Sequence, residues 1–129
     1  MDFIVLTGST SFIDEKLMKK VFEEYRVGSS STKVFVGDCK TGLDKMASRV
    51  VRIDKRFEAD WRTYGKSAGL KRNSEMVEYA KSAWKSHGKQ GRLICLAFFV
   101  EGIESRGTTH CSTLAENMGF EVVKSVSKP

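Results

Sequence analysis

Three short apolar stretches of this chain each run into a turn of small and hydroxyl-bearing residues, followed by a helical pattern. The turns are GSTS at 8–11, GDCKTG at 37–42 and SRGTT at 105–109. A strand that ends in such a turn leaves unpaired backbone N–H groups at the start of a helix, where the helix dipole also favours negative charge. Three such turns indicate that several strands end at one edge of a sheet, where open α/β sheets bind ligands. The pattern predicts a phosphate site, and hence a protein that handles a nucleotide.

Hydrophobic periodicity predicts strands that alternate with helices. Strands are expected at 3–7, 33–36, 56–59, 93–100 and 120–123, and the most apolar of them, 93–100, is the predicted central strand. Helices are expected at 14–25, capped by Asp14 and burying Ile13, around Leu43, at 73–87 and around Leu114. The alternation implies right-handed crossovers between parallel strands. The predicted fold is an α/β, Rossmann-like three-layer sandwich with a mainly parallel sheet, in a single domain covering 1–129.

Several function classes do not fit the composition. No apolar run approaches the roughly 20 residues of a membrane span, and the first residues lack the basic region of a signal peptide, so we expect a cytoplasmic protein without membrane partners. Cys39, Cys95 and Cys111 are odd in number and have no CxxC spacing, which argues against a disulfide framework. His87 and His110 are isolated, so no metal site is expected, and no cofactor is predicted.

The chain is basic, with 22 Lys and Arg against 16 Asp and Glu and a net charge of +6. A basic balance suits any polyanion, nucleic acid as well as nucleotides. The positive residues are scattered without a continuous block, and most are expected on solvated faces. The charge alone therefore does not show whether the partner is a nucleic acid or a nucleotide.

The ordered motifs of the chain carry a family resemblance. They are LTGS at 6–9, VGDCKTGLD at 36–44, ADW at 59–61, AGLKRNSEM at 68–76 and SRGT at 105–108, and together they extend over nearly the whole sequence. In this order they resemble the YspA-like branch of the SLOG superfamily, a name that denotes sensing or processing of nucleotide-derived ligands. The resemblance implies a Rossmann-like fold and a nucleotide-related ligand, and it implies no particular reaction.

The third turn is the main candidate for phosphate binding. Gly107 and Thr108 open a helix, so the amides of Gly107, Thr108 and Thr109 are expected to wrap a phosphate. Arg106 would add a charge-assisted contact, next to Ser105. The alternative is an ordinary helix N-cap with exposed neighbours. The motif order favours the phosphate.

The AGLKRN segment supplies further candidates. Arg72 could clamp a phosphate or stabilise charge during cleavage of a glycosidic bond, so it is the catalytic candidate if the protein is an enzyme. Asn73 is a ligand candidate or, alternatively, the cap of the helix that follows. Trp61 and Tyr64 could stack on a base, although a lid packed on the domain explains Trp61 as well.

The first two turns complete the predicted site. Gly37 and Gly42 permit tight backbone geometry, and Asp38 could accept hydrogen bonds from ribose hydroxyls. Gly8 and Ser9 are expected to form the floor of the pocket. Asp44 is a weaker candidate, because it could equally cap a helix or pair with Lys45.

The superfamily also contains the Lonely Guy phosphoribohydrolases, which cleave the N-glycosidic bond of nucleoside monophosphates. Their glycine-rich motif corresponds to the segment ending at Gly107 and Thr108, and their motif arginine corresponds to Arg72. The position of their catalytic glutamate falls on Cys111. Loss of that carboxylate argues against the same activity, and Glu101, Glu104 and Glu116 are the substitutes that the sequence offers.

Three functions follow, in this order of preference. The first is a module that captures a nucleotide or an ADP-ribose-like derivative, as a sensor or sequestering protein. The second is an N-glycosidic hydrolase that uses Arg72 with an unidentified carboxylate. The third is a DNA-binding protein, because the Smf/DprA proteins also resemble this superfamily, and it ranks last because the sequence has no aromatic and basic stacking platform. A homodimer is also predicted, through an apolar stripe of Met76, Tyr79 and Trp84.

Overall fold

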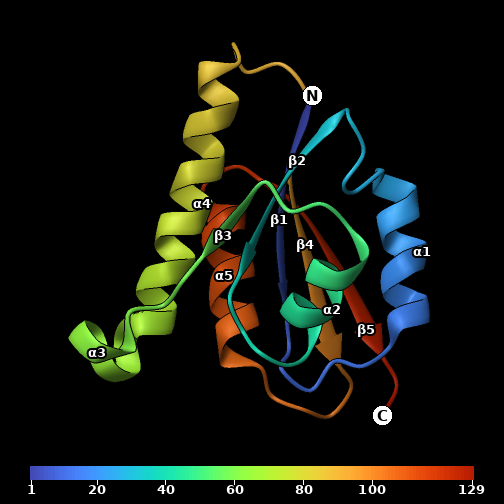
Figure 1. Ribbon diagram of the computed structural model, residues 1–129, viewed down its shortest axis with the longest axis vertical. Coiled ribbons are helices and arrows are strands. Elements are labelled where there is room, and N and C mark those ends of the chain that lie inside the picture. Colours follow the sequence, from blue (N-terminus) through green and yellow to red (C-terminus); the bar gives the residue numbers. More distant parts are fainter.

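The computed structural model describes residues 1–129 as a five-stranded parallel sheet with helices on both faces (Figure 1). The strands are β1 (Asp2–Gly8), β2 (Thr32–Gly37), β3 (Lys55–Phe57), β4 (Leu93–Val100) and β5 (Glu121–Ser127). The helices are α1 (Glu15–Tyr25), α2 (Leu43–Val50), α3 (Trp61–Tyr64), the short 3-10 turn η1 (Gly65–Ser67), α4 (Ala68–Ser86) and α5 (Arg106–Asn117). The predicted α/β sandwich with a Rossmann-like parallel sheet is confirmed.

The sheet has the order β3-β2-β1-β4-β5, and every neighbouring pair is parallel. The prediction that residues 93–100 form the central strand is wrong, because β1 lies in the middle, between β2 and β4. Both β1 and β4 are buried on their two faces. Apolarity therefore could not distinguish the central strand from its neighbour.

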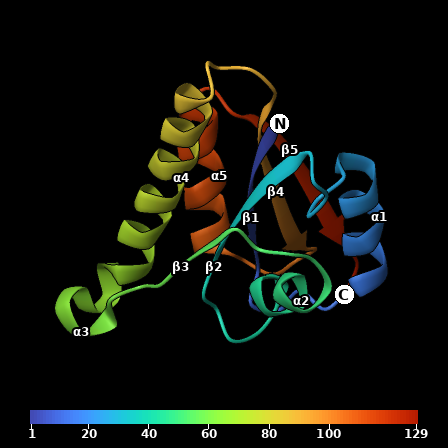
Figure 2. The same ribbon diagram turned by 45° about the horizontal axis from the view of Figure 1, so that its top comes forward.

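Two hydrophobic clusters fix the helices to the two faces of the sheet. Alternate residues of β1 point to opposite faces, as the pleat requires: Ile4 and Leu6 pack with α1 and α2, and Phe3 and Val5 pack with α4 and α5. Figure 2 shows α4 and α5 together on one side of the sheet and α1 and α2 on the other. This packing brings the ends of β1, β2 and β4 to the edge at which α5 begins.

The helix boundaries differ from the predictions in one way that matters for the site. Helix α4 begins at Ala68 rather than near residue 73, so Asn73 lies inside the helix and does not cap it. Gly69 has a low helix propensity but is accommodated in the first turn of α4, close to Trp61. None of the helices, including the 19-residue α4, is both long and apolar enough to cross a membrane.

Helix α1 shows the predicted cap and one incorrect assignment. The side chain of Asp14 accepts a hydrogen bond from the Leu17 N–H, which satisfies one of the free amides of the first turn. Ile13 was predicted to be buried but is 84% exposed, and Met18 fills the core instead. Ile13 precedes the cap, so it lies off the helical stripe that faces the sheet.

The residues that suggested a homodimer are largely used within the domain. Met76 is buried, Trp84 donates from Nε1 to the Gly91 carbonyl at 3.1 Å, and Tyr79 packs edge-on against Phe35 while remaining 45% exposed. Pairing of two copies through this stripe stays a prediction, with Tyr79 as its most exposed residue. Sedimentation at micromolar concentration measures it directly: a mass of about twice 14.5 kDa is expected, and a mass of 14.5 kDa would contradict the prediction.

Candidate functional site

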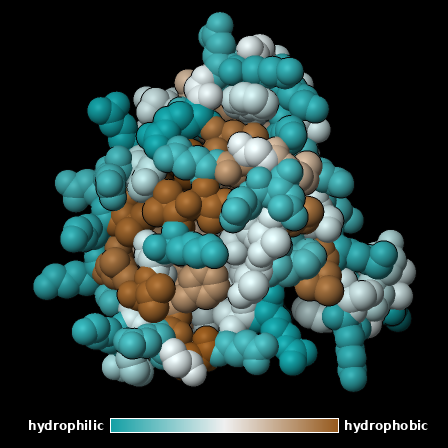
Figure 3. All heavy atoms as spheres, turned by 180° about the vertical axis from the view of Figure 1, so that it is seen from behind, coloured by the Kyte–Doolittle hydropathy of each residue, from teal (hydrophilic) through white to brown (hydrophobic).

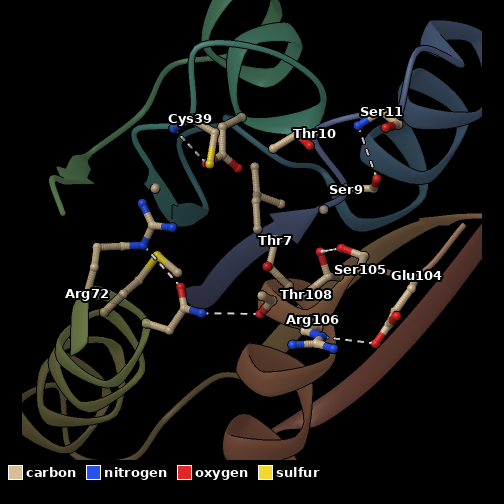
Figure 4. Close-up of a pocket in the computed structure, with 17 residues that line it drawn as sticks. Thr7, Ser9, Thr10, Ser11, Cys39, Arg72, Glu104, Ser105, Arg106 and Thr108 are labelled. Carbon is tan, nitrogen blue, oxygen red and sulfur yellow. Dashed lines mark hydrogen bonds and ion pairs between the residues drawn. The ribbon is translucent and has the colours of Figure 1, made fainter. Parts of the chain in front are cut away.

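A polar cavity of about 230 Å³ lies at the carboxyl ends of β1 and β2, between α4 and the start of α5 (Figure 4). Residues from all three predicted turns and from α4 meet there. The predicted site residues that line it are Gly8, Ser9, Gly37, Arg72, Asn73, Ser105, Arg106, Gly107 and Thr108. Asp38, Gly42, Trp61 and Thr109 do not line it.

The N-terminus of α5 presents free backbone donors to this cavity. The amides of Arg106, Gly107 and Thr108 have no acceptor within the protein, whereas the Thr109 amide donates to the Ser105 carbonyl at 3.0 Å. The free donors are therefore the amides of residues 106–108, whereas the sequence predicted those of 107–109. Ser105 does not cap the helix with its side chain, because its Oγ donates to Thr108 Oγ1 at 2.6 Å. Ser105 occupies the N-cap position without a side-chain cap bond, so the alternative of an ordinary N-cap is supported only in position.

Arg72 faces the cavity from the first turns of α4, and its side chain is only 10% exposed. Its Nη1 donates to Asp38 Oδ1 at 2.6 Å and its Nε donates to Asn73 Oδ1 at 3.0 Å. Asn73 in turn donates from Nδ2 to the Gly107 carbonyl at 3.2 Å. These contacts hold the guanidinium in place and join the end of β2 to the start of α5. Nη2 of Arg72 has no protein acceptor and remains available to a ligand.

Two glycines allow this close packing. A Cβ on Gly37 would lie 2.7 Å from Arg72 Nη1 and 2.8 Å from Asp44 Oδ2, so any side chain there would displace both charged groups. Gly42 has a φ of 73°, which disfavours other residues, and a Cβ there would overlap the Ser9 carbonyl. Gly42 thus shapes the cavity from outside, by letting the start of α2 approach the turn after β1.

Asp38 and Trp61 are placed differently from their predicted roles. Both oxygens of the Asp38 carboxylate are engaged, Oδ1 by Arg72 and Oδ2 by the Ala59 N–H at 3.2 Å. Trp61 is 59% exposed on α3, away from the cavity lining, so it neither stacks over the cavity nor packs as a buried lid.

Asp44 is the carboxylate that the structure brings into the cavity instead. It lies in the first turn of α2, is 5% exposed, and accepts a hydrogen bond from the Cys39 N–H at 3.1 Å. Burial raises the pKa of the Asp44 carboxyl from its usual value of 3.8, against the opposing effects of the Cys39 N–H and the Arg72 guanidinium. A buried carboxyl of raised pKa in a cleft is a typical feature of functional sites.

The raised pKa predicts how stability depends on pH. Because the folded protein holds the Asp44 proton more tightly than the unfolded chain, the free energy of unfolding should fall as pH rises from 3.8 through the raised pKa, by about 1.4 kcal/mol for each pH unit between the two values. Urea unfolding of wild type and Asp44→Asn at several pH values tests this. The variant should lose this part of the decline, and identical pH profiles for both proteins would contradict it.

Other lining residues were not among the predicted site residues. They are Leu6, Thr7, Thr10, Ser11, Cys39, Met76 and Glu104. Thr10 and Ser11 belong to the first predicted turn, so proximity to the turns was the available signal for them. Of the three substitute carboxylates that the sequence offered, Glu104 lines the cavity, and Glu101 and Glu116 do not. Glu104 pairs with Arg106 at the exposed rim, at 3.1 Å.

The structure gives neither cysteine near the site the accessible thiolate that a nucleophile requires. Burial, together with the nearby Asp44 carboxylate, raises the pKa of the Cys39 thiol, which therefore stays protonated at neutral pH. Cys111, which the sequence resemblance aligned with the catalytic glutamate, is fully buried in the core and does not line the cavity. The side chain at this position of α5 is thus part of the packing.

Comparison with known proteins adds little to this geometry. No protein-family model matches the chain. A stretch of 71 residues is 38% identical to the Gene 61 protein of Mycobacterium phage D29, and it covers 55% of this chain but only 46% of the phage protein. The chain thus matches about half the length of this relative, whose name states no activity.

Proposed function

We propose that the protein binds a nucleotide or a nucleotide-derived ligand, with a phosphate at the N-terminus of α5, as a sensor or sequestering module of the YspA-like kind. One observation carries the proposal: the free amides of Arg106, Gly107 and Thr108 and the unpartnered Nη2 of Arg72 border the same cavity. Backbone donors at a helix N-terminus combined with a guanidinium favour a phosphate over a neutral ligand.

The remaining groups suit the sugar of a nucleotide. The hydroxyls of Thr7, Ser9 and Thr10 line the cavity, and Asp44 offers a carboxylate acceptor for ribose hydroxyls, the role first predicted for Asp38. A volume of about 230 Å³ is below the roughly 300–1,000 Å³ of sites that enclose a whole drug-sized ligand. The phosphate and sugar are therefore the enclosed parts, and the base lies at the mouth.

Calorimetric titration with AMP, GMP, ADP-ribose, NAD and adenosine tests the proposal. The ligands with phosphate should bind at least about tenfold more tightly than adenosine, since one charge-assisted hydrogen bond contributes roughly 1.5–3 kcal/mol. Moderate weakening by salt is expected for a few charged contacts. Equal affinity for AMP and adenosine would contradict a phosphate site.

A second candidate function is N-glycosidic hydrolysis, and Asp44 is the observation that favours it. Its buried carboxyl, with a raised pKa beside Arg72, meets the requirement for a general acid that Cys111 cannot supply. Asp44 would then give its proton to the departing base, water would add to the anomeric carbon, and Arg72 would hold the phosphate of the nucleotide in place. Chromatography of AMP or GMP incubated with the protein distinguishes the two functions: free base that disappears with Asp44→Asn supports hydrolysis, and bound but intact nucleotide supports the binding module.

A further inference from the structure

A second hollow of about 480 Å³ lies beside the cavity and has a strongly basic lining. Its cations come from three parts of the chain: the loop after β2 supplies Lys40, helix α2 supplies Lys45 and Arg49, and the edge strand β3 supplies Arg56. Cys39 lines both spaces, so the hollow and the cavity share a wall. In Figure 4 Cys39 lies on the side of the cavity opposite Ser105 and Thr108.

The charges of this hollow have no counterions in the protein. Lys40, Lys45 and Arg49 form neither an ion pair nor a side-chain hydrogen bond, and Arg56 donates only to the hydroxyl of Ser48, at 2.6 Å. The carboxylate of the lining, Asp38, is already paired with Arg72.

Some other basic residues of the protein are paired with carboxylates, whereas the four around this hollow are not. Arg92 pairs with Glu121, Arg52 and Lys33 share Asp54, and Lys19 pairs with Glu15. Four like charges around one hollow repel each other, and a bound anion would relieve that repulsion.

The helix geometry gathers the basic groups on one side. Lys45 and Arg49 are four residues apart on α2 and therefore project from the same face, with Ser48 beside them. Both are exposed, so they can reach a ligand without disturbing the core. The hollow is therefore suited to a solvent-accessible phosphate, and it is larger than the cavity at α5.

We propose that the ligand is a dinucleotide, with two phosphates separated by a nucleoside. This rests on the proposed function: the first phosphate binds the amides of α5, the nucleoside passes Cys39, and the second phosphate lies among Lys45, Arg49 and Arg56. A mononucleotide occupies the smaller cavity and its mouth and leaves the basic hollow empty. The second phosphate of ADP is attached directly to the first, so it extends less far toward the basic hollow than the second phosphate of a dinucleotide does.

The test compares AMP, ADP and 5′-phosphorylated diadenylate (pApA) by calorimetry, on the full chain. The dinucleotide should bind wild type at least about tenfold more tightly than AMP, with ADP between them. Its log affinity should also fall more steeply with log salt, by about 0.7 for each added phosphate contact. Lys45→Glu/Arg49→Glu should remove this gain and leave AMP binding within about twofold. The matched control is Lys16→Glu/Lys20→Glu, which makes the same charge change on an exposed face of α1 and should retain the gain.

Each outcome separates this proposal from the proposed function. If AMP binds but pApA binds no better, or if the gain survives Lys45→Glu/Arg49→Glu, the dinucleotide is wrong and the phosphate site at α5 stands. If neither AMP nor pApA binds, the phosphate site fails and the dinucleotide with it. If a 20-nucleotide single-stranded DNA binds more than about a hundredfold more tightly than pApA, the hollow binds nucleic acid, and the proposal of a dinucleotide ligand is wrong.

Discussion

Gly107→Val is expected to abolish phosphate binding, by about a hundredfold or more in affinity, without loss of stability. Gly107 is exposed, lines the cavity and has no atom within 4 Å of where a Cβ would stand. A valine side chain therefore meets no protein atom but occupies the space in front of the free amides. Valine also has a higher helix propensity than glycine by a few tenths of a kcal/mol, so α5 should not be weakened.

AMP titration and thermal unfolding check the two parts of this prediction together. Thr109→Val is the matched control, because Thr109 is the next exposed residue outside the cavity lining and its amide is already bonded to Ser105. It should leave affinity within about twofold of wild type. If folded Gly107→Val binds AMP as wild type does, the phosphate site does not lie at α5. If Thr109→Val loses AMP binding, the phosphate is held by the amides predicted from the sequence, those of Gly107, Thr108 and Thr109.

The fold could be predicted from the sequence because its elements depend on local patterns. Continuous apolar runs such as Leu93–Val100 can be buried only between two layers, and the cap at Asp14 marks the start of α1. The order of the strands within the sheet was beyond those patterns, because β1 and β4 are equally buried. The start of α4 was not predicted because a glycine such as Gly69 is compatible with both a loop and the first turn of a helix.

The location of the candidate site could be predicted from the sequence, but most of its side-chain contacts could not. The turns after β1, β2 and β4 do converge, since parallel strands end at one edge, and most of the residues predicted there line the cavity. Which carboxylate faces the ligand depends on tertiary contacts: Asp38 is drawn to Arg72, 34 residues away, and leaves Asp44 in the cavity. Sequence spacing contains no information on such a pairing.

The second large effect is expected for Arg72→Ala, which should weaken AMP binding by about ten- to a hundredfold. The estimate corresponds to one charge-assisted hydrogen bond of roughly 1.5–3 kcal/mol, from the Nη2 that has no protein partner. Stability should also fall, by about 1–2 kcal/mol, because Asp38 and Asn73 lose their donor. The loss stays moderate since the Asp38 side chain is 27% exposed and can be hydrated.

A matched variant separates the loss of a ligand contact from the loss of an ion pair. Arg52 also pairs with an aspartate, Asp54, and donates to backbone carbonyls, but it lies outside the cavity. Arg52→Ala should therefore lower stability and leave AMP affinity unchanged. Arg72→Lys should recover only part of the affinity, because a single ammonium cannot hold Asp38 and Asn73 and still donate to a phosphate as the planar guanidinium does. If Arg72→Ala binds AMP as wild type does, Arg72 serves only to join β2 to α5, and the amides of α5 hold the phosphate alone.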